Sequence, residues 1–318
     1  MAFFTHGLTA ILQMFISIGK FNGGSIRGAY FVYFAIANIQ SLSSKLHSSN
    51  RRSSALIPFH LRRSTHSGSL HATSHRVDNF LCNEVRVDFN VRGIQSIIIL
   101  EADAESQEAL ITIALDDKSI AAEEDPYGSV LWPSAKTVSM RLLELNLAGK
   151  SILELGTGTG LVSLAAALSG AQSVLATDYS LFSLSLLDRA KTLQLSTVPE
   201  GVLTTQFLDV KDFSKPLPPA DIVVIADLLY DKGLAVAVGK RVCEAYKRGS
   251  LVIVGNSPGR CGTDDMLHTC KEILGFEVFF RKMIGQTVIG YRHDLIGSTA
   301  TLTPQAIDTT LLEIQLFK

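Results

Sequence analysis

The sequence predicts an α/β fold of the Rossmann-like kind, with a mostly parallel seven-stranded sheet and helices on both of its faces. First, short apolar runs of the buried-strand type alternate with helical segments between residues 133 and 274. Second, a glycine-rich turn at residues 156–160 separates the first of these strands from a helix. Third, an acidic residue stands in or just after each of the first four strands: Glu154, Asp178, Asp209 and Asp227.

Each element of the sheet domain follows from its local pattern. Pro133 suits the start of a helix, where its missing N–H is not needed, and Gly249 suits a helix end because it can adopt αL. The last two strands have no helix between them, so they predict an antiparallel strand at one edge of the sheet. The predicted strands cover residues 151–155, 173–177, 202–208, 221–226, 251–254, 276–283 and 311–317, and the helices cover 133–145, 161–168, 181–192, 233–247 and 263–274.

A smaller unit is expected before this domain. Residues 84–91 alternate apolar and polar side chains, and residues 97–100 and 109–114 are further strand candidates. Together they predict a small antiparallel β elaboration. We therefore divide the chain into residues 1–77, residues 78–125 with this elaboration, and residues 126–318 with the sheet domain, in which 284–310 forms an insertion.

Residues 1–77 have the composition of a targeting leader. They contain no Asp or Glu, eight Lys or Arg, and eleven serines within residues 41–77. The apolar stretches at 7–19 and 29–39 are shorter than the roughly 18 residues of a membrane span. We expect import into an organelle, a plastid or a mitochondrion, with the plastid slightly preferred. The alternative is a disordered N-terminus on a cytoplasmic protein.

Charge and residue usage exclude several classes of function. Of the 29 Lys and Arg, eight lie in residues 1–77, which leaves 21 against all 30 Asp and Glu in the rest, a formal charge of −9. Such a surface does not suit nucleic acid. The four cysteines form no C-x-x-C pair, and six of the eight histidines lie in the first 75 residues, so we expect reduced thiols and no metal site. No G-x-S-x-G elbow is present.

The glycine-rich turn carries most of the chemical information. Its pattern is E-x-G-x-G-x-G, with Glu154 two residues before Gly156, and not the G-x-G-x-x-G of dinucleotide folds. A nearby carboxylate suits a ligand with an ammonium and a sulfonium better than a pyrophosphate. Asp178, eighteen residues past Gly160, is placed to accept ribose hydroxyls. The alternative is that the glycines serve geometry alone and that aspartates such as Asp209 are helix caps.

Taken together, the motifs resemble the family 16 protein methyltransferases, mostly lysine methyltransferases of the class I, S-adenosylmethionine (SAM)-dependent superfamily. The match covers roughly residues 80–318 in order of elements. Its specific parts are Leu131-Trp132-Pro133-Ser134, the turn from Glu154 to Gly160, Thr177-Asp178 and Asp227-Leu228-Leu229-Tyr230.

This resemblance implies a sheet order of 3-2-1-4-5-7-6 and SAM as the cofactor. It implies that Trp132 packs beside the cofactor, Glu154 and the glycine turn hold its amino-acid end, Asp178 binds the ribose and Asp209 approaches the adenine amine. The implied catalytic residues are Asp227 and Tyr230, at the substrate entrance. The implied cofactor-binding set is Trp132, Glu154, Gly156, Thr157, Gly158, Gly160, Asp178, Asp209 and Ala226.

Two departures from the family concern the substrate more than the cofactor. Val210 stands where relatives often carry tryptophan, and Asp188, Arg189 and Gln194 stand where they often carry asparagines. We expect methylation of a lysine in a protein substrate by a monomeric enzyme. The alternatives are a small-molecule methyltransferase, a non-catalytic module on the same fold, and, least favoured by the glycine spacing, a nicotinamide dehydrogenase.

Overall fold

The computed structural model describes residues 73–116, 126–195, 198–258, 260–275, 281–290 and 305–314. Ala72–Lys318 forms one compact unit. The predicted leader lies outside the described residues except for its last five. Of these, Ser74–Val77 form strand β1, so a strand already begins within the segment that composition assigns to the leader.

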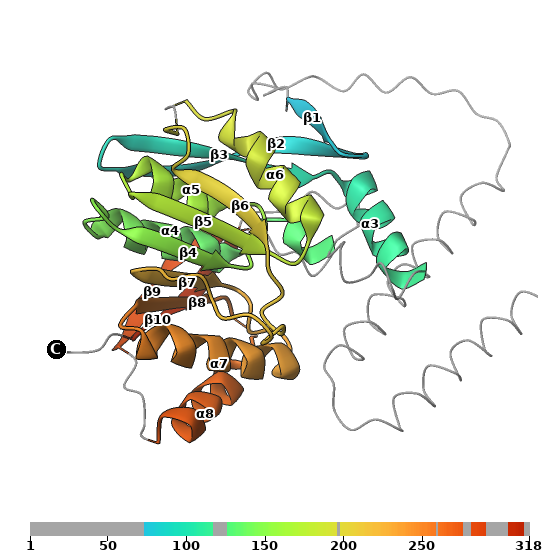
Figure 1. Cartoon of the computed structure of the whole chain (residues 1–318). Helices are drawn as coiled ribbons and strands as arrows, with labels where there is room; N and C mark the ends of the chain where they lie inside the picture. Colours follow the sequence, from blue (N-terminus) through green and yellow to red (C-terminus); the bar gives the residue numbers. More distant parts are fainter. Residues whose placement is uncertain are drawn as a thin grey trace, which may run out of the picture. The chain divides into compact units, whose positions relative to one another are not determined.

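The main sheet has seven strands in the order β6-β5-β4-β7-β8-β10-β9, which is the order that the family resemblance implies. The first five are parallel to one another. The antiparallel edge is also confirmed: β10 pairs antiparallel with both β8 and β9, and β9 is the edge strand (Figure 1). The strands are β4 (Ser151–Leu155), β5 (Ser173–Asp178), β6 (Leu203–Phe207), β7 (Ile222–Ala226), β8 (Leu251–Asn256), β9 (Arg281–Gly290) and β10 (Gln305–Ile314).

Alternate residues of the central strands enter two separate cores, one on each face of the sheet. In β4, Ile152 belongs to one core and Leu153 to the other, and in β7 Val224 and Val223 divide in the same way. All four side chains are at most 2% exposed. Burial on both faces explains why these strands are apolar throughout rather than alternating.

Helices cover both faces, as predicted. The first core is closed by α4 (Pro133–Glu144), α5 (Leu161–Leu168) and α6 (Leu181–Lys191), and the second by α7 (Lys232–Lys247) and α8 (Thr263–Leu274) (Figure 1). The short 3-10 helix η1 (Pro126–Ser129) precedes α4. The bounds of α4 to α8 lie within two residues of the predicted helix bounds.

The N-terminal elaboration is confirmed as a three-stranded antiparallel sheet of β1, β2 (Phe80–Val91) and β3 (Ile94–Ala102). Ile97 and Ile99 of β3 are fully buried in the first core. Gln194, just after α6, accepts a hydrogen bond from Ile98 N–H at 3.1 Å and donates to its carbonyl at 2.6 Å. The elaboration is thus fixed to the helix that follows β5.

One predicted element has the wrong secondary structure. Residues 109–114 lie in helix α3 (Ala104–Asp116), not in a strand. Asp103 accepts a hydrogen bond from Ser106 N–H at 2.8 Å, and this cap together with the Ala, Glu and Gln residues that follow outweighs the β-branched residues at 111–113.

The last two strands are also displaced from their predicted positions. Much of the predicted insertion at 284–310 belongs to β9 and β10, and residues 291–304 between them lie outside the described residues. The predicted strand 276–283 ends just before Gly285, whereas β9 continues to Gly290. Pairing of β9 with β10 along most of its length overrides the weak strand propensity of that glycine.

Candidate active site

The candidate site lies at the carboxyl ends of β4, β5, β6 and β7. The glycine turn follows β4, Asp178 ends β5, Asp209 follows β6 by two residues, and Asp227 follows β7 directly. Because these four strands are parallel neighbours, their ends meet at one edge of the sheet, which is where α/β folds bind ligands.

All three glycines of the turn have positive φ, at 75°, 51° and 83° for Gly156, Gly158 and Gly160. A Cβ on Gly156 would lie 2.0 Å from Leu228 Cδ1, and one on Gly160 would lie 2.4 Å from Leu187 Cδ1. A Cβ on Gly158 would meet Gly128 O at 3.4 Å, an ordinary contact. Packing therefore favours glycine most strongly at Gly160, whose Cβ would also meet Leu187 Cβ at 2.9 Å, whereas at Gly156 the end of the flexible Leu228 side chain could move aside. At Gly158 only the positive φ favours glycine.

Asp178 joins the end of β5 to this turn. Its Oδ2 accepts a hydrogen bond of 2.9 Å from Gly158 N–H, and its Oδ1 accepts one of 2.9 Å from Ser180 N–H at the start of α6. The residue is 6% exposed. The carboxylate is thus held in one orientation beside the turn, as a ribose-binding residue would be.

Glu154 lies beneath the turn. Its Oε2 accepts hydrogen bonds from the hydroxyls of Thr157 (2.8 Å) and Ser163, and the residue is 1% exposed. Burial raises the pKa of its carboxyl group to about 8, although both hydroxyls favour the charged form. In this position Glu154 shapes the turn from below.

Two further members of the predicted cofactor set stand at strand ends. Asp209 Oδ1 accepts a hydrogen bond from Lys211 N–H at 2.8 Å, so its side chain caps the turn that it begins. Ala226 is the last residue of β7 and pairs with Gly255 of β8. Asp209 follows Leu208, whose N–H donates to the carbonyl of Asp178 at 2.9 Å, so Asp209 and Asp178 belong to neighbouring segments of the same edge.

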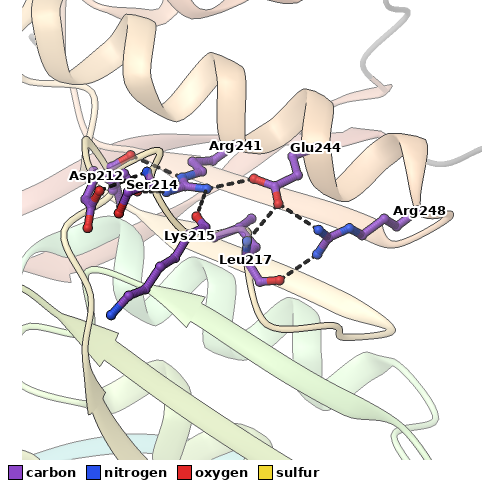
Figure 2. A network of polar contacts seen from close by, with 8 residues as sticks. Asp212, Ser214, Lys215, Leu217, Arg241, Glu244 and Arg248 are labelled. Carbon is purple, nitrogen blue, oxygen red and sulfur yellow. Dashed lines mark hydrogen bonds and ion pairs between the residues drawn. The ribbon is translucent and has the colours of Figure 1, made fainter.

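The loop that carries Asp209 is held by a buried arginine of α7 (Figure 2). Arg241, 2% exposed, donates to the carbonyls of Val210 (3.2 Å), Asp212 and Lys215 (3.1 Å) and to Glu244 (2.8 Å). Since three backbone carbonyls of one loop converge on one guanidinium, the loop has a defined path between β6 and β7.

Asp227 connects the two most specific sequence motifs. Its Oδ2 accepts from Ser134 N–H (3.0 Å) and Ser257 Oγ (2.7 Å), and its Oδ1 accepts from Ser257 N–H (2.7 Å) and Arg260 Nε (3.2 Å). Its backbone has a φ of 58°, which few residues other than glycine, asparagine and aspartate adopt. The side chain therefore caps α4 from a strand 93 residues away.

Arg260 links Trp132 and Tyr230 to this carboxylate, because its guanidinium group lies near both rings and donates to Asp227. The guanidinium carbon of Arg260 lies 4.3 Å from the centre of the Trp132 ring and 5.7 Å from that of Tyr230. Trp132 also donates from its indole N–H to Tyr127 O at 2.9 Å. The structure thus brings together Trp132 of one sequence motif and Asp227 and Tyr230 of another.

Several contributors were missed from the sequence. They are Ser163 on Glu154, Ser257 and Arg260 on Asp227, and Glu101 of β3, whose carboxylate accepts from Leu131 N–H at 2.5 Å. Ser134 stood in a recognised motif, but the others carry no pattern that marks them. No cluster of metal ligands occurs among the described residues, and none of their helices is long and apolar enough to cross a membrane.

Comparisons with known proteins agree with these motifs. A lysine methyltransferase family model matches residues 115–256. The electron transfer flavoprotein beta subunit lysine methyltransferase of Rattus norvegicus is 31% identical over 140 residues, 43% of this chain and 52% of that protein. Protein-lysine methyltransferase METTL21E of Bos taurus is 35% identical over 119 residues, 33% of this chain and 39% of that protein.

Among solved structures, the chain is similar to magnesium protoporphyrin IX methyltransferase from Synechocystis PCC 6803 with bound SAM, at 18% identity and a TM-score of 0.39. That match covers 57% of this chain and 77% of the other. The chain spans about half the length of the flavoprotein methyltransferases that it matches. The segment that matches the lysine methyltransferase family model, residues 115–256, holds the glycine turn and all the strand-end carboxylates.

Proposed function

We propose that this chain transfers a methyl group from SAM to a lysine side chain of a protein. One observation carries the proposal: within the segment that matches the lysine methyltransferase family, Asp178 is hydrogen-bonded to Gly158 at the top of the glycine turn. This pairing presents a fixed carboxylate and a backbone that a ligand can approach closely, side by side. A nucleoside with an amino-acid tail needs these two features.

The residues around the turn fit SAM. Asp178 would take the ribose hydroxyls, Asp209 the adenine amine, and the turn with the first N–H groups of α5 the amino-acid carboxylate. The buried hydroxyl of Ser183 has no hydrogen-bond partner among the described residues, and a Cβ on Gly128 would lie 2.5 Å from it. It is a polar group near the turn that a ligand atom could satisfy. Trp132 would border the same site.

When bound, SAM supplies a methyl group on a sulfonium centre. The chain's own task is to place an amine in line with that methyl and to keep water away, since orientation alone is worth effective molarities of ~10⁵–10⁸ M. A lysine amine, with an ordinary pKa of ~10.4, must first lose a proton. Tyr230 would orient the amine. Asp227, whose side chain is held by Ser134 and Ser257, would orient it from the other side.

The acceptor that we propose is a lysine on a protein surface. Residues 78–318 carry a formal charge of −9, which attracts basic surfaces over a long range. The rat relative acts, by its name, on the electron transfer flavoprotein beta subunit, so the corresponding protein of this organism is the first substrate to try. We further propose that the enzyme works as a monomer and does not bind nucleic acid.

Import into an organelle belongs to the same proposal. The support is the composition of residues 1–77, without acids and rich in serine. The relatives named above come from animals, which have no plastids, so they give no support to the preference for a plastid. A fluorescent fusion of residues 1–80 that stays in the cytosol would count against import.

The proposal is tested by incubating the 318-residue chain and methyl-labelled SAM with a proteome of its own organism, followed by mass spectrometry. We expect label on lysine in one or a few proteins. Asp178→Ala is the negative control: it removes the carboxylate that we place on the ribose side, and circular dichroism verifies that the variant folds, since Asp178 also accepts hydrogen bonds from Gly158 and Ser180. Label that appears in metabolites and in no protein would favour a small-molecule methyltransferase. No transfer despite SAM binding would favour a non-catalytic module.

A further inference from the structure

Arg260 lies between two aromatic rings and a carboxylate. Its guanidinium carbon lies 4.3 Å from the Trp132 ring centre and 5.7 Å from the Tyr230 ring centre, both within the range of a cation–π interaction. Its Nε donates to Asp227 Oδ1 at 3.2 Å. The side chain is only 15% exposed, so it is a cation largely removed from water and stabilised on three sides.

The three groups around Arg260 would also suit another cation. A carboxylate with two aromatic faces binds alkylammonium groups as well as guanidinium groups, because both are attracted by the negative charge and by the ring quadrupoles. The groups come from two separate segments: Trp132 before α4, and Asp227 and Tyr230 in the segment after β7. Trp132, Asp227 and Tyr230 therefore surround one position from several sides, and we name these three residues the cation site.

The cation site does not depend on Arg260 for its shape. Asp227 keeps three other donors, Ser134 N–H, Ser257 N–H and Ser257 Oγ, at 2.7–3.0 Å. Trp132 keeps the hydrogen bond from its indole to Tyr127 O. If the Arg260 side chain rotated away, the carboxylate and the tryptophan would still be held in place.

We propose that Trp132, Tyr230 and Asp227 form a binding site for an alkylammonium group, and that Arg260 is its internal occupant. A lysine of the protein substrate enters by displacing the Arg260 side chain. Only the identity of the displacing group as an acceptor lysine rests on the proposed function. Competition by Arg260 lowers the apparent affinity for outside cations by the fraction of time that the site is open. It therefore favours substrates that offer further contacts and rejects free amines.

The test uses n-butylammonium as the probe and the fluorescence of Trp132, which is the only tryptophan of the chain, as the readout. In the 318-residue chain, Arg260→Gln removes the internal cation and keeps a polar, uncharged side chain. We expect it to bind n-butylammonium at least about tenfold more tightly than the parent, with little response to the uncharged analogue n-butanol. Equal or weaker binding by Arg260→Gln, or an equal response to n-butanol, overturns the proposal.

Two further variants distinguish loss of the cation that occupies the site from a general disturbance of the fold. Arg260→Lys replaces the occupant by another cation and should keep the weak binding of the parent. Tight binding by this variant would contradict the proposal. Arg86→Gln, at an exposed arginine of β2 whose Nη1 donates to Ser96, is the matched control and should behave as the parent. Circular dichroism and calorimetry with S-adenosylhomocysteine verify the fold of each variant.

The two proposals can fail separately. If Arg260→Gln gains affinity for n-butylammonium but the parent methylates no protein, the cation site stands and the methyltransferase proposal falls. If the parent methylates lysine but Arg260→Gln gains no affinity, the reverse holds.

Discussion

The backbone N–H of Ser134 donates a hydrogen bond of 3.0 Å to Oδ2 of Asp227, across 93 residues of sequence. The helix α4 begins after Trp132, which offers no side-chain cap of its own. Asp227 supplies the cap from the end of β7, and its negative charge also suits the positive end of the helix dipole. The motif before the glycine turn and the motif after β7 are thus two halves of one structural unit.

We expect Asp227→Asn to destabilise the fold by about 1–3 kcal/mol, because an amide turns a donor toward groups that already donate. Asparagine tolerates the φ of 58°, so the change tests the carboxylate and not the backbone. Urea unfolding followed by circular dichroism measures the effect. Asp231→Asn is the control, since Asp231 caps α7 by accepting from Leu234 N–H and asparagine caps equally well. Equal effects of the two changes would contradict a special role for Asp227.

The three glycines of the turn should respond differently to alanine. Gly160→Ala is expected to cost about 2–4 kcal/mol, since its Cβ meets Leu187 and its φ of 83° is strained for alanine. Gly158→Ala carries only the backbone strain and should cost less in the free energy of unfolding. It should instead weaken SAM binding, and Gly158→Arg should abolish it. Urea unfolding and calorimetry separate the two effects, and a Gly158→Arg variant that binds SAM normally would refute this placement of the cofactor.

Particular elements show which parts of the fold could be predicted from the sequence. The strand and helix alternation was predictable because β4, β7 and β8 are buried on both faces and must be apolar throughout. The strand order came from the family resemblance, since periodicity does not specify which strands are neighbours. The strand predicted at 109–114 failed because Asp103, six residues earlier, caps the helix that contains it.

In the candidate site too, the sequence predicts the position of a residue along the chain but not its tertiary contacts. The sequence places Glu154 next to the turn but does not specify the direction of its side chain, which points toward Ser163 under the turn. Arg260 follows β8 by four residues and belongs to no motif, so only the fold brings it to Trp132. Contacts made across tertiary structure leave no periodic or spaced signal in one sequence.

The buried carboxyl of Glu154 should make stability depend on pH. Its pKa is raised from 4.5 to about 8, so the folded state holds this proton more tightly than the unfolded state. The stability from this group is full below about pH 4.5 and is lost as pH rises toward 8. Glu101, with a pKa raised to about 7 by burial, adds to the loss at lower pH.

Between pH 7 and 8 we therefore expect the parent to lose about 1 kcal/mol of unfolding free energy that Glu154→Gln does not lose. The glutamine can still accept from Thr157 and Ser163 through its Oε1 atom. Urea titrations at the two pH values measure the difference, with the exposed Glu200→Gln as the control. The same loss in Glu154→Gln as in the parent would show that Glu154 is charged throughout this range.

Tyr230→Phe should reduce turnover about tenfold and change the affinity for SAM less than twofold. The ring, which packs against the second core and lies near Arg260, is retained in this variant. Only the hydroxyl that we propose to orient the amine is lost. Steady-state kinetics with the unmethylated acceptor protein, once the labelling experiment has identified it, give the turnover. Calorimetry with SAM gives the affinity. A parallel loss of SAM affinity would place Tyr230 on the cofactor side.

Arg241 provides a test of the loop after β6. Arg241→Lys keeps the charge, but an ammonium cannot reach the carbonyls of Val210, Asp212 and Lys215 together (Figure 2). We expect a loss of about 1–3 kcal/mol in unfolding free energy. We also expect SAM binding about tenfold weaker, because the loop carries Asp209. Arg248→Lys is the matched control: Arg248 donates to Leu217 O, further along the loop, and to Glu244 of α7, and its side chain is 39% exposed.

A second readout distinguishes a positioned Asp209 from a merely looser fold. If Asp209 accepts a hydrogen bond from the adenine amine, the parent should bind S-adenosylhomocysteine about tenfold more tightly than its inosine analogue, which has a carbonyl in place of that amine. In Arg241→Lys this preference should fall toward one, because the loop no longer holds Asp209 against the purine. A preference that survives in the variant, beside reduced stability, would show that Arg241 supports the fold without placing the adenine-binding residue.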